Sequence, residues 1–286
     1  MSSTTQTELL EHARQGDREA FGELYEQVER PLSAFLYRMI GDRKDAEDLA
    51  QEAAIEALEG ISQFPNGSSF RAWVFRLALR AATEYLKDAA RWDPEEVIYA
   101  GRMAAEDAAL RRRLRKLHRS RIHTTYQLRE QIDFCFTAVG LTLPPAEKAA
   151  LLLTEVHDLP AGEAAQVFEV PQAVVEHRRQ QARQALIDAY QDRCQLINRN
   201  GACSQCADLD TLLYGDRRHT ELALFQIPLD PCPTAEQRAE TLTQRLAIVR
   251  AIDPLRAEGA KIHECLMEYA RQRLNKPGAR RKEVRP

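Results

Sequence analysis

Two segments, Asp45-Ala-Glu-Asp-Leu-Ala-Gln-Glu52 and Ser69-Phe-Arg-Ala-Trp-Val-Phe-Arg76, carry the strongest structural signal in this chain. In the second segment and its continuation, apolar residues recur every three or four positions, which is the period of a helix with one buried face. These positions are Phe70, Trp73, Val74, Leu77, Ala78, Ala81 and Tyr85. Ser68 or Ser69 is placed to cap the first amides. The pattern predicts an amphipathic helix that begins near residue 69.

The opposite face of this predicted helix is basic, with Arg71 near its start and Arg76, Arg80 and Lys87 further along. Two interpretations remain open. Either the cations are solvated and Trp73 is simply a core residue, or the apolar face packs while the cations meet phosphate groups.

The preceding segment also predicts a helix, because Leu49, Ala53, Ala57 and Ile61 fall on one side of it. Its other side gathers acidic and amide side chains with few compensating cations. These are Asp45, Asp48, Gln51, Glu52 and Glu56. A solvated acidic face and a docking surface for a partner protein are both compatible with this pattern.

Nearly every other segment also predicts helix, since Ala, Leu, Glu, Gln and Arg are abundant and β-branched runs are sparse. We therefore expect an all-α protein. The predicted divisions are a first domain at 7–92, a basic linker at 93–127, a second domain at 128–190, an extension at 191–275 and a disordered tail at 276–286. The linker contains a cationic cluster between Arg111 and Arg121, with Leu110, Leu114 and Leu117 in a narrow helical stripe.

The second domain contains the pattern of a helix-turn-helix, with a short helix over 163–168, a turn at Glu169-Val170 and a second helix after Pro171. Pro144 and Pro145 suit the first turn of an earlier helix. The second helix of the motif would present Gln172, Ala173, Glu176, His177 and Gln180 to base edges, with Arg178 and Arg183 near phosphates.

These motifs together resemble a known family. Asp48-Leu-Ala-Gln-Glu52, Phe64, Ser69 to Ala78 and Glu84-Tyr-Leu-Lys87 resemble the second conserved region of extracytoplasmic-function (ECF) sigma factors of bacterial RNA polymerase. The segment from Leu143 to Arg183 resembles the fourth conserved region of the same family. The resemblance implies a sigma region 2-like domain, a sigma region 4-like domain and a linker that threads near the template strand and the RNA exit path.

The resemblance also implies site residues and partners. Core RNA polymerase would bind the face formed by Asp45, Asp48, Gln51 and Glu52. The proximal promoter element would be bound and melted by Arg71, Trp73, Arg76, Arg80 and Lys87, and the distal element would be read by the helix after Pro171. A separate anti-sigma factor is a further candidate partner. The competing hypothesis is a freestanding helix-turn-helix regulator, which would lack the first domain.

This chain departs from the family pattern at several positions. Glu169 stands where relatives usually have the glycine of the turn, so it must adopt or avoid a left-handed conformation. Ala164 replaces a usual isoleucine, Glu176 a usual lysine and Arg179 a usual leucine, and Leu79-Arg80 replaces a common Arg-Asn pair. A buried arginine at 179 would be costly unless it is paired or reaches solvent. These changes predict unusual or weak reading of the distal element.

Five of the six cysteines lie in the extension. Cys194, Cys203 and Cys206 are close in sequence, and a zinc ion would need a fourth ligand from His219, Cys232, His263 or Cys265. Structural zinc, redox sensing and free structural thiols all remain open. Cys135, between two phenylalanines, is most simply a core residue.

The rest of the extension predicts helices over 235–252 and 254–274, which could pack on each other or against the helix-turn-helix and so regulate the protein.

Composition bounds the function further. The net charge of −3 argues against a protein that grips DNA alone through bulk electrostatics. The chain shows no membrane-spanning run, no signal segment and no catalytic motif, so we expect a cytoplasmic, non-enzymatic protein that requires no cofactor.

Overall fold

The computed structural model describes residues 3–65, 67–87, 92–118, 124–191, 194, 234–257 and 259–274. The chain forms two compact units. The first consists of Met1–Ala89 and Pro145–Gln181, and the second of Ala90–Pro144 and Ala182–Pro286. Every regular element in the described residues is helical, which confirms the all-α prediction. No helix among the described residues is both long and apolar enough to cross a bilayer.

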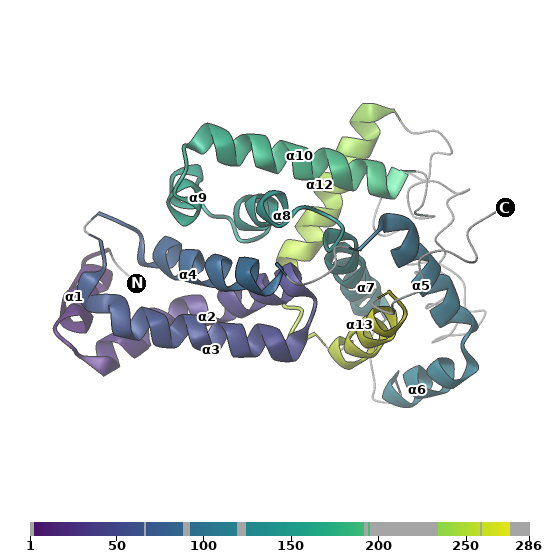
Figure 1. Cartoon of the computed structure of the whole chain (residues 1–286), viewed down its shortest axis with the longest axis horizontal. Helices are drawn as coiled ribbons and strands as arrows, with labels where there is room; N and C mark the ends of the chain where they lie inside the picture. The colour runs from purple at the N-terminus through teal and green to yellow at the C-terminus, as the bar shows by residue number, and fades with distance from the viewer. Residues whose placement is uncertain are drawn as a thin grey trace. The chain divides into compact units, whose positions relative to one another are not determined.

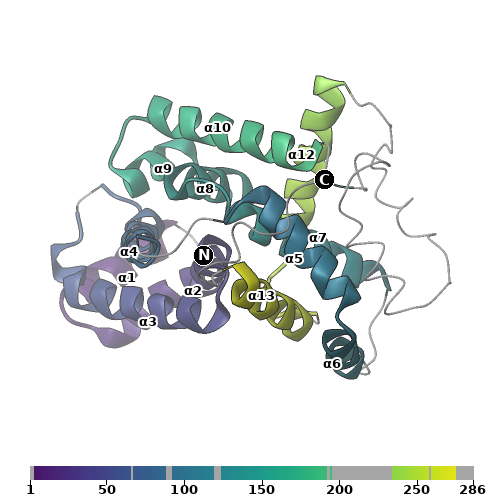
Figure 2. The same cartoon turned by 45° about the vertical axis from the view of Figure 1, so that its right-hand side comes forward.

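The first unit begins with α1 (Ser3–Arg14), α2 (Arg18–Ile40), α3 (Arg43–Gly60), the short helix η1 (Ile61–Gln63) and α4 (Phe70–Tyr85). Figures 1 and 2 show α2 and α3 running side by side. The unit continues with α8 (Pro145–Leu151), the π-helical turn η2 (Leu152–Val156), α9 (Ala161–Phe168) and the first half of α10 (Gln172–Gln191).

Side-chain caps fix where these helices begin. Asp17 accepts hydrogen bonds from the amides of Glu19 and Ala20 at the start of α2, and Asp42 accepts one from Asp45 at the start of α3. The Ser69 hydroxyl accepts a hydrogen bond from the Ala72 amide at 3.3 Å, so one of the two predicted caps of α4 is confirmed. α8 begins at Pro145 as expected, while α10 begins at Gln172, one residue after Pro171.

The core of the first unit is built around α4. The predicted apolar face is buried at Phe70, Trp73, Val74, Leu77 and Ala78. Four further residues of α4, Ala72, Phe75, Leu79 and Ala82, are also buried, so this helix is covered on more than one side. The predicted apolar side of α3 is buried as well, at Leu49, Ala53, Ala57 and the following Ile61.

The prediction was wrong at Tyr85, which is 38% exposed. Its hydroxyl donates a hydrogen bond to Asp45 Oδ2 at 2.5 Å. Tyr85 is the last residue of α4, and the phenol finds a carboxylate partner at the surface instead of entering the core.

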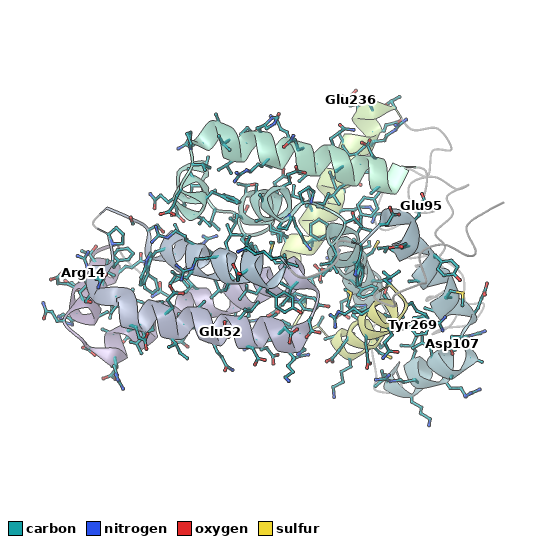
Figure 3. The ribbon with its side chains drawn as sticks, viewed as in Figure 1. Arg14, Glu52, Glu95, Asp107, Glu236 and Tyr269 are labelled. Atoms are coloured by element: carbon teal, nitrogen blue, oxygen red, sulfur yellow. The ribbon has the colours of Figure 1, made fainter. Side chains whose placement is uncertain are left out.

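The second unit contains α5 (Pro94–Glu106), α6 (Ala108–His118), α7 (Thr124–Gly140), the second half of α10, α12 (Ala235–Ala251) and α13 (Ala260–Leu274). α12 packs against α7, and α13 packs against α5, α6 and α7. Within α13, Tyr269 lies near Asp107, and its hydroxyl donates to the carbonyl of Met103 at 3.2 Å (Figure 3). The predicted linker and the predicted extension therefore share one folded unit.

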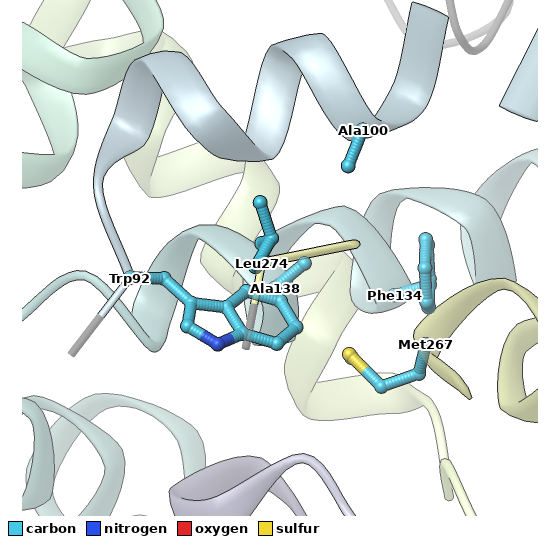
Figure 4. Packing of buried hydrophobic residues seen from close by; sticks show 6 residues of the cluster. All are labelled: Trp92, Ala100, Phe134, Ala138, Met267 and Leu274. Carbon is cyan, nitrogen blue, oxygen red and sulfur yellow. The ribbon is translucent and has the colours of Figure 1, made fainter. Parts of the chain in front are cut away.

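Two apolar clusters hold α13 in place. One joins Trp92, Ala100, Phe134, Ala138, Met267 and Leu274 (Figure 4). The other joins Ala104, Leu110, Leu114, Ile262 and Cys265, with Leu117 packed at its edge. The leucine stripe predicted in the linker is thus confirmed, and residues of the final helix cover it.

Two details of the extension and its surroundings differ from expectation. α12 ends within a residue of its predicted bounds, but the final helix begins at Ala260 instead of Pro254, because Pro254 lies in a turn that Asp253 stabilises by accepting from the Leu255 amide. Cys135 is only half-buried, although its neighbours Phe134 and Phe136 are in the core. The predicted tail at 276–286 lies outside the described residues.

A buried lysine lies where α8 packs against α2. Lys148 is 3% exposed, and its ammonium group donates to the carbonyl of Met39 at 3.2 Å. Burial lowers the pKa of Lys148 to about 7. Nearby, burial and then the cations Arg38 and Arg71 hold the pKa of His157 well below its ordinary value. Lys148 and His157 therefore lie in buried surroundings that favour the neutral form of each side chain.

The titration of Lys148 predicts that stability rises with pH. Unfolding returns Lys148 to its ordinary pKa of 10.5, so between about pH 7 and 10.5 the unfolded chain binds a proton that the folded chain does not. The free energy of unfolding should increase by about 2 kcal/mol between pH 7 and 9 through this group. Denaturant titrations of the wild type and Lys148→Met check it; an equal pH dependence in both proteins would contradict the assignment.

Gly259 packs directly against the buried side chains of Glu130 and His263. Its amide donates to Glu130 Oε2 at 2.6 Å, and an added Cβ would lie 2.4 Å from the same oxygen. We expect Gly259→Ala to lower the free energy of unfolding by about 1–3 kcal/mol. Gly22→Ala is the matched control, because nothing lies within 4 Å of that added Cβ and helix α2 gains propensity. Thermal unfolding of both variants measures the difference, and equal melting temperatures would refute it.

Candidate nucleic-acid interface

The acidic face predicted for partner docking lies on α3. Asp48, Gln51 and Glu52 are exposed, whereas Asp45 is half-buried and bonded to Tyr85. Figure 3 shows Glu52 on α3. Within the part of the chain that the structure describes, no ion pair engages Asp48 or Glu52. Because the opposite side of α3 is buried, this face is held rigidly while its carboxylates stay in solvent.

Three of the cations predicted on this helix, Arg71, Arg76 and Arg80, lie on α4, whereas Lys87 lies two residues beyond its end at Tyr85. Each of the four has a partner within the protein. Arg76 pairs with Glu169 at 2.7 Å, and Arg71 donates to the carbonyl of His157. The remaining two pair within the first predicted domain: Arg80 with Glu56, and Lys87 with Glu84. In this conformation the basic face is therefore partly neutralised.

Trp73, which the sequence left as either a core residue or part of a promoter-binding face, is buried to 8% exposure. Its ring packs edge-on against Phe64 with centroids 5.3 Å apart, and against Phe70 at 6.0 Å. Gly60 lies against the same indole, where a Cβ would approach to 3.4 Å. The structure places Trp73 in the core, so stacking on a base would require this cluster to rearrange.

The helix-turn-helix forms as α9, a turn and α10. Glu169 ends α9 in the left-handed conformation, with φ 53° and ψ 40°. This conformation costs a residue with a Cβ about 1–2 kcal/mol, a penalty that glycine would avoid. The turn is closed by the Val170 amide, which donates to the carbonyl of Ala165 at 3.2 Å. The sequence expectation that Glu169 faces a strained choice is confirmed, since it adopts the left-handed state.

The residues predicted to meet base edges share an exposed face of α10. They are Gln172, Ala173, Glu176, His177 and Gln180. Of the cations predicted near phosphates, Arg178 lies over the Phe168 ring at 5.1 Å. In the second unit, Arg183 donates to Thr243 Oγ1 of α12 at 3.0 Å. The extension thus contacts the far end of the same helix.

Arg179 and Glu176 form a charged network that the sequence only partly predicted. Arg179 Nε donates to Glu176 at 2.8 Å, and its guanidinium also pairs with Glu155. Hydrogen bonds from Arg179 and then from Gln180 lower the pKa of Glu176 to about 2. Arg179 is therefore paired, as its position required, and Glu176 stays ionised on the exposed face. The sequence analysis did not identify Glu155 as the partner of Arg179, although it expected a buried arginine there to be paired.

Of the three cysteines predicted to bind zinc, only Cys194 lies among the residues that the structure describes. Cys203 and Cys206 lie outside the described residues. Cys194 is buried and accepts a hydrogen bond from Arg245 Nη2 at 3.1 Å, while that guanidinium lies 4.5 Å from the centroid of the Tyr190 ring. Among the described residues, no group of three or more His, Cys, Asp or Glu side chains is arranged to hold a metal ion.

The matches to known proteins fall on the same segments. The family model for sigma-70 region 2 matches residues 24–92, and that for sigma-70 region 4 matches residues 138–186. The RNA polymerase sigma-H factor of Pseudomonas aeruginosa is 28% identical over 184 residues, covering 64% of this chain and 93% of that protein. The ECF RNA polymerase sigma-E factor of Haemophilus influenzae is 29% identical over 182 residues, with the same two coverages.

The ECF RNA polymerase sigma factor SigW of Bacillus subtilis is 24% identical over 190 residues, covering 62% of this chain and 92% of that protein. A solved structure of CnrH in complex with the cytosolic domain of CnrY is similar with a TM-score of 0.44 and 21% identity, over 65% of this chain and 98% of that chain. The family models thus coincide with the acidic and basic helices and with the helix-turn-helix described above. On the two family-model matches and these sequence relatives, the chain belongs to the extracytoplasmic-function sigma factors of bacterial RNA polymerase.

Proposed function

We propose that this protein directs core RNA polymerase to specific promoters, docking through the α3 face formed by Asp45, Asp48, Gln51 and Glu52. The supporting observation is the contrast between the two sides of α3. One side is buried by small and aliphatic residues, and the other presents Asp48 and Glu52, which make no ion pair among the described residues. A rigid helix with an exposed acidic face suits a basic surface on a larger partner.

The same proposal explains how a chain with net charge −3 acts on DNA. A free protein of this charge gains little from phosphate neutralisation, so DNA binding depends on attachment to the polymerase. Arg71, Arg76 and Arg80 on α4, with Lys87 just beyond its end, would then meet the proximal element, and Trp73 would contribute only if its cluster opens. The exposed face of α10 would read the distal element.

Charge reversal tests the docking face. We expect Asp48→Lys with Glu52→Lys to reduce affinity for core polymerase at least tenfold, because attraction becomes repulsion at a complementary surface. The fold should survive, since both side chains are exposed. Glu23→Lys with Glu26→Lys is the matched control: it makes the same charge change at exposed positions of α2 with similar spacing. Binding would be measured by titrating labelled protein with core enzyme; undiminished affinity of the α3 variant would contradict the docking assignment.

A footprinting experiment tests promoter reading and separates this function from that of a freestanding helix-turn-helix regulator. We expect specific protection of promoter DNA only when core polymerase is added. Gln172→Ala with His177→Ala should then weaken specific protection by about 1–3 kcal/mol for each base-edge interaction that the substitutions remove. Gln184→Ala, at an exposed position further along α10, is the control. Protection by the protein alone would favour the regulator instead.

Several finer points belong to the proposal. We place the protein in the cytoplasm with RNA polymerase, in a non-enzymatic role that requires no cofactor. Regulation by the extension is supported by the packing of α13 on the linker helices and by the bond between α12 and Arg183. Zinc at Cys194, Cys203 and Cys206 and a separate anti-sigma factor remain predictions, and elemental analysis of the purified protein tests the zinc.

A further inference from the structure

The exposed face of α10 that would read DNA carries an acidic side chain. Glu176 is the fifth residue of α10, and its side chain is 49% exposed. In a helix-turn-helix, residues near the start of the second helix are those that reach base edges in the major groove. A carboxylate at this position approaches the negatively charged phosphates of DNA. Only a favourable contact with a base can offset that repulsion.

Hydrogen bonds within the protein hold this carboxylate in one orientation. Arg179 Nε donates to Glu176 Oε2 at 2.8 Å, and Arg179 Nη2 donates to Glu176 Oε1 at 2.5 Å. Gln180 Nε2 donates to the same Oε1 at 2.7 Å. Arg179 is fixed in turn by an ion pair with Glu155, whose side chain is only 15% exposed. All four residues belong to the first unit, so the carboxylate is positioned before DNA arrives.

The same bonds determine what Glu176 can still bind. An ionised carboxylate has about four lone-pair sites, two on each oxygen. Arg179 and Gln180 together occupy both sites on Oε1 and one on Oε2, which leaves one site on Oε2. Because hydrogen bonds from Arg179 and then from Gln180 lower the pKa of Glu176 to about 2, its carboxylate accepts hydrogen bonds and has no proton to donate. The group that it meets on DNA must therefore be a donor.

Few groups in the major groove are donors. Cytosine presents its N4 amino group and adenine its N6 amino group, whereas guanine and thymine present acceptors. Adenine also presents the acceptor N7 beside its amino group, and an acceptor there repels a carboxylate. Cytosine has no acceptor on its own major-groove edge, so it is the base that suits Glu176 best. Glutamate in place of the usual lysine therefore exchanges a donor for an acceptor at this position.

We propose that Glu176, positioned by Arg179 and Gln180, is a specificity-determining residue that selects a cytosine in the distal promoter element. This inference rests on the proposed function of α10 and adds the base that it reads. Glu176 discriminates largely against the wrong bases. Opposite a base without a donor, the carboxylate loses its water and gains no hydrogen bond in return.

The first experiment selects DNA with the complete holoenzyme. Core RNA polymerase loaded with the wild-type chain enriches fragments from a library whose upstream segment is randomised, and the motif is compared with that of Glu176→Ala. Asp188→Ala is the matched control, because it removes the same charge from an exposed position about three turns further along α10. Thermal unfolding of each variant verifies that it folds.

The wild type should enrich cytosine at one position of the motif. Glu176→Ala should flatten the preference at that position alone, and Asp188→Ala should leave the motif unchanged. In the wild type, thymine in place of this cytosine should weaken holoenzyme binding about five- to a hundredfold, the range typical of one mismatched base pair. A motif that Glu176→Ala does not change would overturn the inference, and so would a preference for any other base at the position that this variant flattens.

A chemical change in the DNA tests the same contact without relying on the folding of a variant. A 2-pyrimidinone deoxynucleoside at the selected cytosine lacks the N4 amino group and keeps the ring. Its effect on base pairing is common to both proteins, so the comparison isolates the contact with Glu176. The loss of binding should be at least about fivefold greater for wild-type holoenzyme than for Glu176→Ala holoenzyme. Equal losses would show that Glu176 does not meet this amino group.

Arg179→Leu tests the positioning role of Arg179. A carboxylate that is no longer held loses orientation on binding, so the ratio of the affinities for cytosine and thymine should fall while cytosine stays preferred. A merely structural role would weaken binding to both DNAs equally. An unchanged ratio would overturn the role assigned to Arg179.

The outcomes distinguish this inference from the proposed function. If the holoenzyme enriches no sequence, the proposed function fails and the cytosine assignment fails with it. If the holoenzyme enriches a motif that Glu176→Ala leaves unchanged, the proposed function stands and the inference alone is overturned.

Discussion

Burial of α4 is the constraint on which the rest of the first unit depends. Helices α2 and α3 pack against it, and α9 packs along it, so a single helix contributes to the core of both predicted domains. The aromatic cluster of Phe64, Phe70 and Trp73 anchors one side of α4. Because close packing leaves little room for adjustment, the positions of the arginines on α4 follow from the positions of its buried residues.

A comparable constraint shapes the second unit. The stripes on α5 and α6 are too narrow to be stable alone, and α13 supplies the apolar surface that covers them. This joins the linker, which a sigma factor uses between its two domains, to an extension that lies beyond the residues matched by the family models. The physical consequence is that the extension is a structural component of the linker unit.

The sequence predicted the helices well because their signals are local. Periodicity located the buried faces of α3 and α4, and the serine before Phe70 identified the cap of α4. The turn at Glu169-Val170 was also predicted, from the helix-turn-helix pattern, and Glu169 adopts the left-handed conformation there. Tyr85 and Cys135 were placed too deeply, because helical periodicity cannot tell where the covering partner ends. The beginning of α13 was missed for a similar reason, since proline at 254 fits a turn as well as a first helical turn.

The sequence alone determined the helical class, the acidic and basic faces and the family resemblance, because each of these is written in short stretches of neighbouring residues. Only the tertiary structure decided which groups those faces meet. The pairing of Arg76 with Glu169, of Arg179 with Glu155 and of the Lys148 ammonium with the Met39 carbonyl joins residues far apart in the chain. Such partners are chosen by how helices pack, and packing depends on the whole set of buried side chains at once.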